Sequence, residues 1–558
     1  MTAIGQVSPT NVSLWSRLYG FGSIFAKTVR DSRRATIVTA GVLGLVFIGV
    51  SRAITAEFDT AQSRTELENI VNAVPPILQG MAGQVVNVGT LGGYLQYKYG
   101  LFFPLVVSLW SILALSGTLA GETQRGSLEF VAATGRSRRR VALEKLSGHV
   151  LMLGLAVFVA FVSIAIAGNS FATLPGDEIS VLSAFGYAIW MGLLALTAGA
   201  LAFALGPFVG RGAAAGITGF VMFAGFIVNG YRGPVPELAP FANLTWWGWT
   251  YDHVALAGQY DWPAVGLTAI VTVILLAIGI EAFVRRDIGV TTALPTPSMP
   301  RSLLGLGGPL GRAVSISLGA AIAWGLGVGF FGLVLGSAAQ GFMEQIQESP
   351  QFIELLSTAF PNVDYASAGG FLQLLFVQFG VIFGGLAAAT FVSAWASDET
   401  SGRLEMVLAT PLARARWAIA GGIGMLVNVA IFVVLTAAGI GLGVSTTSSD
   451  VATPLVGSLV LGLYAAALTG IGLAIGGVLG TRFATTVTVL FVIVTWFVEL
   501  LGPLLNLPDI IRQLALTSHY GQTMVGVWDP VGIVASVALA VGGIAIGAWG
   551  FARRDMRG

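Results

Sequence analysis

Long apolar stretches alternate with short polar segments along the whole chain. A helix of about 20 mostly apolar residues crosses a bilayer core, and twelve stretches of this kind can be distinguished. The predicted spans are 35–53, 100–120, 147–168, 180–207, 213–230, 263–284, 313–337, 371–396, 416–441, 454–480, 483–505 and 531–550. The pattern therefore predicts an all-α polytopic membrane protein.

The composition supports this prediction. Of the 558 residues, 55% are hydrophobic and 10% are charged, whereas soluble proteins are about 25% charged. These values exclude a soluble enzyme, a nucleic-acid-binding protein and a disordered scaffold. The chain has no cysteine, which excludes disulfides and thiolate sites. Its three histidines, His149, His253 and His519, are too scattered to indicate a metal site.

The distribution of basic residues predicts the orientation of the chain. Cytoplasmic loops carry an excess of Lys and Arg, and several basic residues precede the first span. They are Arg17, Lys27, Arg30, Arg33 and Arg34. With twelve spans, both termini are then expected in the cytoplasm. Residues 1–34 form the cytoplasmic N-terminus, in which 12–27 have the spacing of an amphipathic helix lying in the membrane interface.

Two cytoplasmic segments repeat each other. Residues 121–140 and 397–416 align at an offset of 276, and the identical pairs include Gly126 with Gly402, Leu128 with Leu404 and Glu129 with Glu405. The two halves also end alike, in Phe-Val-Arg-Arg-Asp at 283–287 and Phe-Ala-Arg-Arg-Asp at 551–555. The repeat predicts two parallel six-helix halves, 35–287 and 313–558, joined by a cytoplasmic linker at 288–312.

The repeated segment predicts a short surface helix. Acidic residues stand at its beginning (Glu122; Asp398 and Glu399) and arginines at its end, as the helix dipole favours. Leu128 and Val131, like Leu404 and Val407, give apolar side chains at i and i+3. The alternative is a basic loop that only fixes topology, but topology does not require identical spacing of Gly, Leu-Glu and Ala-Thr.

The pattern Glu-x-x-x-Gly-x-Leu-Glu-x-x-x-Ala-Thr, followed by arginines, resembles the coupling segment of bacterial type V (ABC-2-like) ABC exporter permeases. Gly93-Tyr94 and the final Arg-Arg-Asp are similar too. The nearest likeness is to fused twelve-span permeases of polyketide-antibiotic, tetronasin-like and multidrug exporters, and it covers both halves. The chain departs from the pattern at Gly135, where the second half has Pro411, and at Ala413, where the first half has Ser137.

The resemblance implies that the two segments contact ATPase subunits. The implied coupling residues are Glu122, Gly126, Leu128, Glu129 and Arg138, and then Glu399, Gly402, Leu404, Glu405 and Arg414. A P-loop needs a lysine after a glycine-rich turn, and Lys27, Lys98 and Lys145 do not have that setting. We therefore expect a permease with no ATPase site and no cofactor of its own. ATP and Mg²⁺ would bind two copies of a separate ATPase chain at the bacterial cytoplasmic membrane.

The resemblance also implies a transport path lined by the second and fifth spans of each half. The aromatic candidates are Phe102, Phe103, Trp110, Phe220, Phe223, Phe226, Phe376, Phe379, Phe491 and Trp496. Aromatic residues with few charges favour hydrophobic or amphipathic small molecules, including antibiotics, drugs and lipids. Each of these residues can instead face lipid or a neighbouring helix.

Three other functions are compatible with parts of the pattern. An ion-driven secondary multidrug transporter needs ionisable residues within its spans. Only Glu281 and Glu499 approach this, both near span ends and without an obvious basic partner, so structural anchoring is favoured. A membrane transferase would have to use Glu57 and Asp59, which the second half does not repeat. An ATPase-coupled complex that extracts lipids or signals would carry the same docking segments.

Overall fold

The computed structural model describes residues 23–74, 79–80, 82–119, 121–122, 136–233, 235–285, 308–347, 367–377, 380–400, 402–448, 450–501, 508, 510 and 513–554. Two compact units divide the chain. Unit 1 comprises Met1–Val74 and Leu78–Pro295, and unit 2 comprises Pro75–Ile77 and Thr296–Gly558. Each unit is described by itself.

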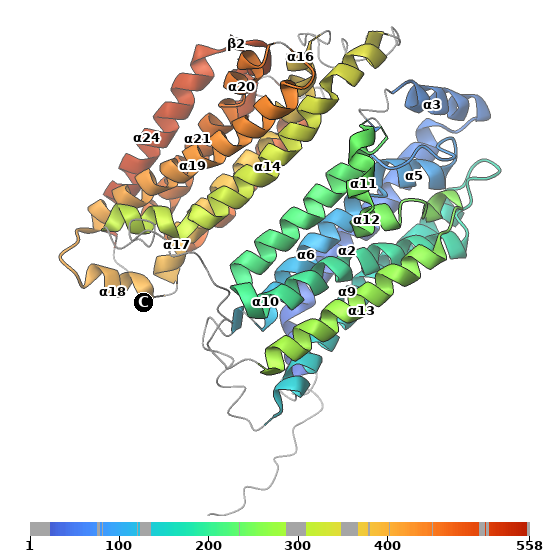
Figure 1. Cartoon of the computed structure of the whole chain (residues 1–558), viewed down its shortest axis with the longest axis horizontal. Coiled ribbons are helices and arrows are strands. Elements are labelled where there is room, and N and C mark those ends of the chain that lie inside the picture. Colours follow the sequence, from blue (N-terminus) through green and yellow to red (C-terminus); the bar gives the residue numbers. More distant parts are fainter. Residues whose placement is uncertain are drawn as a thin grey trace, which may run out of the picture. The chain divides into compact units, whose positions relative to one another are not determined.

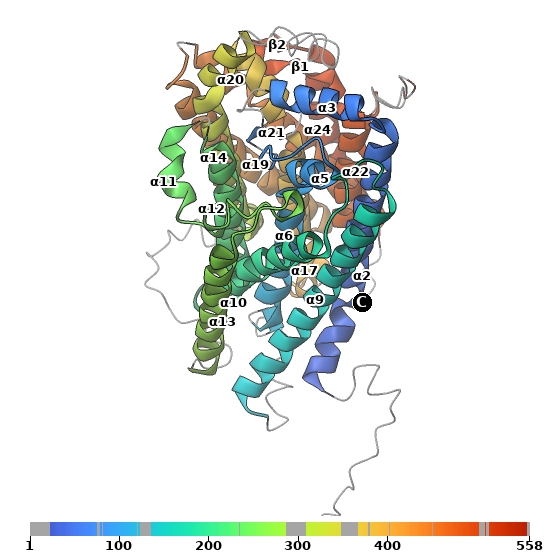
Figure 2. The same ribbon diagram turned by 90° about the vertical axis from the view of Figure 1, so that its right-hand side faces the viewer.

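Unit 1 is a bundle of long helices. They are α2 (Ile24–Glu57), α3 (Ala61–Ala73), α5 (Leu91–Tyr99), α6 (Phe102–Thr118), α9 (Arg138–Ser170), α10 (Val181–Tyr231) and α13 (Trp262–Arg285). Short helical turns between α10 and α13 are η1 (Pro236–Leu238), α11 (Ala239–Ala242), α12 (Trp246–Trp249) and η2 (Ala255–Ala257). Helix α2 packs along α9, and α10 packs against both α6 and α13 (Figures 1 and 2).

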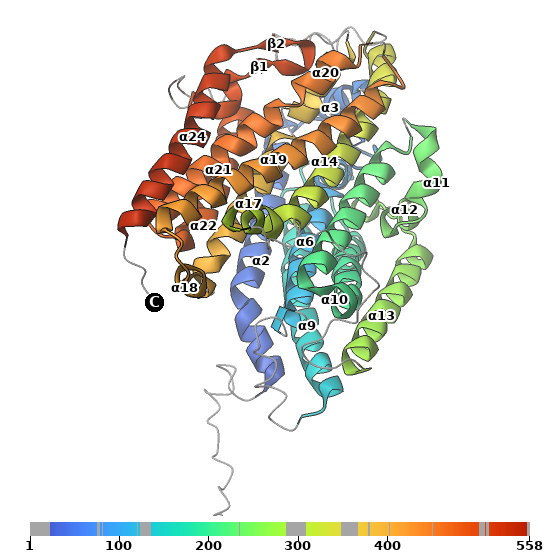
Figure 3. The ribbon, with the colours of Figure 1, turned by 60° about the vertical axis from the view of Figure 1, so that its left-hand side comes forward.

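Unit 2 has a similar succession of elements. Its long helices are α14 (Pro309–Gln347), α17 (Val381–Thr400), α19 (Arg414–Val444), α21 (Val460–Val478), α22 (Thr481–Leu501) and α24 (Pro530–Arg553). The shorter elements are α16 (Ala368–Leu372), the π-helical turn η4 (Gln373–Val377), α18 (Arg403–Leu408), α20 (Ala452–Gly457), η5 (Leu516–His519) and η6 (Thr523–Val525). Strands β1 (Gly521–Gln522) and β2 (Val527–Trp528) pair antiparallel beside η6. Helix α18 lies at the opposite end of the unit from this ladder (Figure 3).

Nine helices of the described residues are long and apolar enough to cross a membrane, and α5 with α6 forms a tenth such element bent by 47°. The chain is thus an all-α polytopic membrane protein. Helix α10, with 51 residues, is longer than a bilayer crossing requires, and its backbone breaks at Gly210 (φ 78°). The predicted spans 180–207 and 213–230 lie on either side of this break. Helix α22, over the predicted span 483–505, belongs to the shorter apolar helices, so a total of twelve stays a prediction.

Glycines allow the closest helix contacts within unit 2. A Cβ on Gly439 of α19 would lie 2.0 Å from the carbonyl oxygen of Gly329 on α14, and one on Gly543 of α24 would lie 2.3 Å from that of Gly470 on α21. Only a residue without a side chain permits this approach of two backbones, as in small-residue packing of membrane helices.

The interfacial segment predicted at the N-terminus is only partly described. Of the N-terminal amphipathic stretch at 12–27, residues 12–22 lie outside the described residues. From Ile24 onward the chain is already α2, capped by the Ser23 side chain, which accepts a hydrogen bond from the amide of Ala26.

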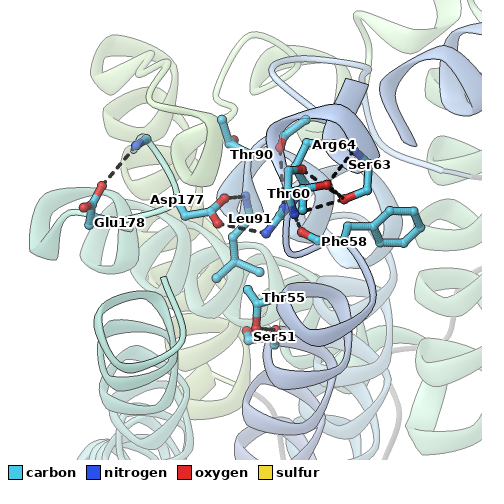
Figure 4. A network of polar contacts seen from close by, with 12 residues as sticks. Ser51, Thr55, Phe58, Thr60, Ser63, Arg64, Thr90, Leu91, Asp177 and Glu178 are labelled. Atoms are coloured by element: carbon cyan, nitrogen blue, oxygen red, sulfur yellow. Dashed lines mark hydrogen bonds and ion pairs between the residues drawn. The ribbon is translucent and has the colours of Figure 1, made fainter. Parts of the chain in front are cut away.

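A buried ion pair joins three segments at one end of unit 1 (Figure 4). The Arg64 guanidinium on α3 lies 2.8 Å from the Asp177 carboxylate in the α9–α10 loop, and the two side chains are only 5% and 2% exposed. Arg64 also donates to the carbonyl of Phe58, and Asp177 accepts from the amide of Leu91 at the start of α5. The pair therefore fixes α3, α5 and the α9–α10 loop together.

Candidate functional site

The first repeated segment is described at its two ends. Gly126, Leu128 and Glu129 lie outside the described residues. Glu122 accepts a 2.6 Å ion-pair contact from Lys145 of α9, whose side chain is 4% exposed. The carboxylate of Glu122 is therefore committed to a contact within unit 1.

The second end of this segment forms the start of α9. The Ser137 side chain caps the helix by accepting from the amide of Arg140, and the Glu144 carboxylate pairs with Arg136 and Arg140 at 3.0 and 2.9 Å. Glu144 also accepts from the amide of Ile24 at the start of α2. A carboxylate is stabilised beside a helix N-terminus by the helix dipole, so Glu144 holds the first turns of α2 and α9 together.

Arginines of the same turn contact the end of α13. Arg138 donates to the carbonyl of Val284, and Arg139 pairs with Glu281 at 3.0 Å. Arg285 lies 3.6 Å from the same glutamate. Glu281 thus has basic partners that its local sequence pattern does not indicate. Arg139 is distant in the chain, and Arg285 directly follows the predicted span. The side chain of Glu499 lies outside the described part.

The second repeated segment is described almost completely. After α17 the chain turns at Gly402 (φ 73°), a conformation suited to glycine, and forms the six-residue α18. Leu404 is 1% exposed, so it anchors α18 to unit 2. The prediction that Leu404 is an exposed apolar contact is wrong; the side chains that α18 exposes include Glu405 and Met406.

The acidic residues of this segment also differ from the prediction. Asp398 and Glu399 do not begin a surface helix; they lie in the last turn of α17, where the dipole disfavours a negative charge. Arginines compensate for it. Asp398 accepts two hydrogen bonds from Arg312 at 2.9 and 3.1 Å, and Glu399 accepts from Arg554 at 2.6 Å and from Thr481 at 2.7 Å. These contacts tie the end of α17, directly before α18, to the starts of α14 and α22 and to the end of α24.

Several contacts recur in both units. Arg414 at the start of α19 donates to the carbonyl of Arg554, as Arg138 donates to that of Val284. The side-chain oxygen of Gln96 accepts from the amide of Leu256, and that of Gln373 accepts from the amide of Met524. In both units, the arginine-rich turn therefore binds a main-chain carbonyl at or next to the repeated Arg-Arg-Asp ending.

The predicted path residues have different environments. Phe103, Phe226 and Phe376 are buried within their units, where they pack against Phe47, Trp247 and Phe331. Phe102 and Phe220 are exposed, and Trp110, Phe223, Phe491 and Trp496 are half-buried. Phe379 lies outside the described residues. The partly exposed members have surface available for cargo, whereas the buried ones fill the helix bundles; a role in transport stays a prediction for all of them.

The histidines do not gather in one place. Among the described residues, no group of three or more His, Cys, Asp or Glu could hold a metal ion. His253, in the loop after α12, accepts from the amide of Asp261 through Nδ1, so its Nε2 donates to the carbonyl of Gly186 at 3.3 Å. Burial lowers the pKa of His253, which favours a neutral, structural side chain.

The apolar helices define the chain as a polytopic α-helical membrane protein. Residues 306–552 match the family described as multidrug efflux system permease Rv1217c, C-terminal domain. The chain is 25% identical over 490 residues to the multidrug efflux system permease protein Rv1217c of Mycobacterium tuberculosis (strain ATCC 25618 / H37Rv). That similarity covers 86% of this chain and 85% of the relative. Together with the fold, these findings support a transport permease related to multidrug efflux systems.

Proposed function

We propose that the chain is the membrane subunit of an ATP-driven exporter of type V, powered by two copies of a separate ATPase. The observation that carries the proposal is the repeated segment at 121–140 and 397–416. In its described copy, α18 exposes charged and apolar side chains, and it directly follows the end of α17, which the ion pairs of Asp398 and Glu399 hold in place. A rigidly anchored turn transmits force, whereas a basic loop that only sets topology needs no such anchoring.

The coupling residues then divide into two groups. Glu405, and by position Glu129, contact the ATPase directly, with Met406 beside Glu405. Glu122, Arg138, Glu399, Leu404 and Arg414 position the segment through contacts within the chain. Gly402 supplies the turn, and Gly126 holds the corresponding position in the sequence.

We further propose twelve spans in two six-span repeats. The recurrent contacts of Arg138 and Arg414, and of Gln96 and Gln373, support a repeated architecture. So does the positive φ of Gly210 and Gly480, each of which precedes the span that the repeat places fifth. The basic residues favour a bacterial cytoplasmic membrane location with both termini in the cytoplasm.

The cargo in this proposal is a hydrophobic or amphipathic small molecule, such as an antibiotic, a drug or a lipid. ATP and Mg²⁺ bind the partner ATPase, and the chain itself holds no cofactor. An ion-gradient-driven multidrug transporter remains the second candidate. Glu281 does not favour that candidate. Within the described residues it is paired with Arg139 and Arg285 near the end of α13, as expected of a structural ion pair and not of an ion-coupling carboxylate within a span.

The energy source distinguishes the two candidates. In vesicles containing the chain and its co-purifying partners, we expect export of a fluorescent drug to require ATP and to continue when a protonophore collapses the proton gradient. A matched sample that receives ADP in place of ATP is the control. Transport that proceeds with ADP and stops with the protonophore would contradict the proposal.

A further inference from the structure

Unit 1 contains a cavity of about 660 Å³ between α2, α6, α9 and the middle of α10. Its lining includes Lys27, Trp110, Glu122, Lys145, His149 and Arg211. Small-molecule sites typically measure about 300–1,000 Å³ and combine apolar walls with a few fixed polar groups. The cavity therefore has both the size and the composition of a ligand site.

Among the described residues that line the cavity, one positively charged side chain has no ion-pair partner. Lys145 pairs with Glu122 at 2.6 Å and Lys27 pairs with Asp31 at 2.9 Å. Arg211 has no ion-pair partner within the described residues. Its side chain runs beside Gly121, where an added Cβ would lie 2.9 Å from the Arg211 Cδ, so the glycine leaves room for the arginine. The described cavity residues thus carry one more positive than negative charge.

The uncharged part of the cavity wall includes two aromatic side chains, His149 and Trp110. The His149 ring is 1% exposed, its Nε2 lies 3.0 Å from the Ser111 hydroxyl, and its Nδ1 has no hydrogen-bond partner among the described atoms. Trp110 is half-buried and packs edge-on against this ring at 5.7 Å. Trp110 therefore supplies an aromatic surface to the cavity, and the buried His149 ring supports it from behind.

Unit 2 closes the corresponding region. At the offset of 276, the positions of Lys145 and His149 correspond to Gly421 and Met425, and the position of Ser111 corresponds to Ala387. The Trp395 ring fills the space: a Cβ on Gly421 would lie 2.5 Å from its Nε1, and it stacks on Trp417 at 5.1 Å. About 20 Å³ remains beside these residues. The region is thus an open cavity in unit 1 and is nearly filled by side chains in unit 2.

We infer that the cavity of unit 1 binds an amphipathic organic anion, with its apolar body against Trp110 and its anionic group on Arg211. A guanidinium is suited to this role because it pairs with carboxylates, sulfonates and phosphates through several donors. The inference rests on the proposed function, since it assigns this anion as cargo. It predicts that transported molecules are selected for negative charge as well as for apolar area.

Two probes of the same shape and opposite charge test the inference. Tetraphenylborate and tetraphenylphosphonium are titrated separately onto the purified full-length chain in phosphatidylcholine nanodiscs, and binding to empty nanodiscs is subtracted. We expect tetraphenylborate to bind more tightly. The substitution Arg211→Gln should weaken its binding roughly tenfold, because it removes the positive charge that attracts the anionic probe, and should not weaken binding of tetraphenylphosphonium. Trp110→Ala should weaken binding of the anion.

The chain offers a matched control in Arg482, which is likewise exposed and follows the glycine break before α22. Arg482→Gln should leave tetraphenylborate binding unchanged. Equal effects of Arg211→Gln and Arg482→Gln, or tighter binding of the cation, would overturn the inference.

A further titration identifies the source of the anion. Replacing a quarter of the lipid by phosphatidylglycerol should leave probe affinity at the Arg211-dependent site unchanged if the site takes cargo. Displacement of the probe by phosphatidylglycerol would show a lipid site and overturn the cargo assignment. The assay contains neither ATPase nor ATP, so its failure is distinguishable from a failure of the chain to recruit an ATPase.

Discussion

Replacing Glu405 by lysine is expected to lower cargo-stimulated ATP hydrolysis of the assembled complex at least tenfold, with the chain still inserted in the membrane. Glu405 is exposed on α18, and Leu404 beside it is buried, so the substitution changes the docking surface without disturbing its anchor. A like charge placed in an interface costs several kcal/mol, and about 1.4 kcal/mol is already tenfold. The measurement is phosphate release with and without a transported drug.

The matched control is Glu66→Lys, the same charge reversal at an exposed position of α3, which should leave stimulation intact. The double substitution Glu129→Lys with Glu405→Lys should remove stimulation almost completely, because it alters both repeated segments. Stimulation at the original level in the double variant would exclude the assignment of these segments as ATPase contacts.

Replacing Asp177 by asparagine is expected to destabilise unit 1 by about 3–5 kcal/mol, because it leaves a buried arginine charge without its counterion. Arg64 is 5% exposed and its guanidinium points at the Asp177 carboxylate (Figure 4). Thermal unfolding in detergent, followed by the loss of monodisperse protein, should shift downward by several degrees.

Its neighbour Glu178 provides the control for this variant. Glu178 is exposed and accepts only from the amide of Gly176 among the described contacts, so Glu178→Gln should unfold near the original temperature. The double variant Arg64→Leu with Asp177→Leu removes both charges and should recover part of the loss. Equal unfolding temperatures for Asp177→Asn and Glu178→Gln would contradict the role given to the ion pair.

The sequence predicted the helices well because apolar length alone determines where a chain can cross a membrane. The predicted span 147–168 lies within α9, 263–284 within α13, and 531–550 within α24. The hydropathy pattern could not show that two predicted spans, 180–207 and 213–230, form a single helix α10 with a break at Gly210. The break is a local change in backbone dihedral angles, which hydropathy does not report. Nor could it show how far helices extend beyond the apolar core, as α2 does from Ile24.

The candidate site was predictable in its position but not in its contacts. Repetition at a fixed offset identified the two segments, and the Arg-Arg-Asp endings were recognised as a second repeat. The hydrogen-bond partners of Asp398 and Glu399 include Arg312, Thr481 and Arg554, which lie at least 82 positions away in the chain. Pairs of this separation form only in the folded chain, which is why the dipole argument assigned the two acids to the wrong helix.

The most direct test of the central claim is purification of the tagged chain from its native membrane, followed by quantitative mass spectrometry of the proteins that accompany it. The account predicts a P-loop ATPase at two copies per chain, lost from the preparation of the Glu129→Lys and Glu405→Lys double variant. Recovery of the chain without an ATPase, together with drug transport that stops when the proton gradient is collapsed, would contradict it.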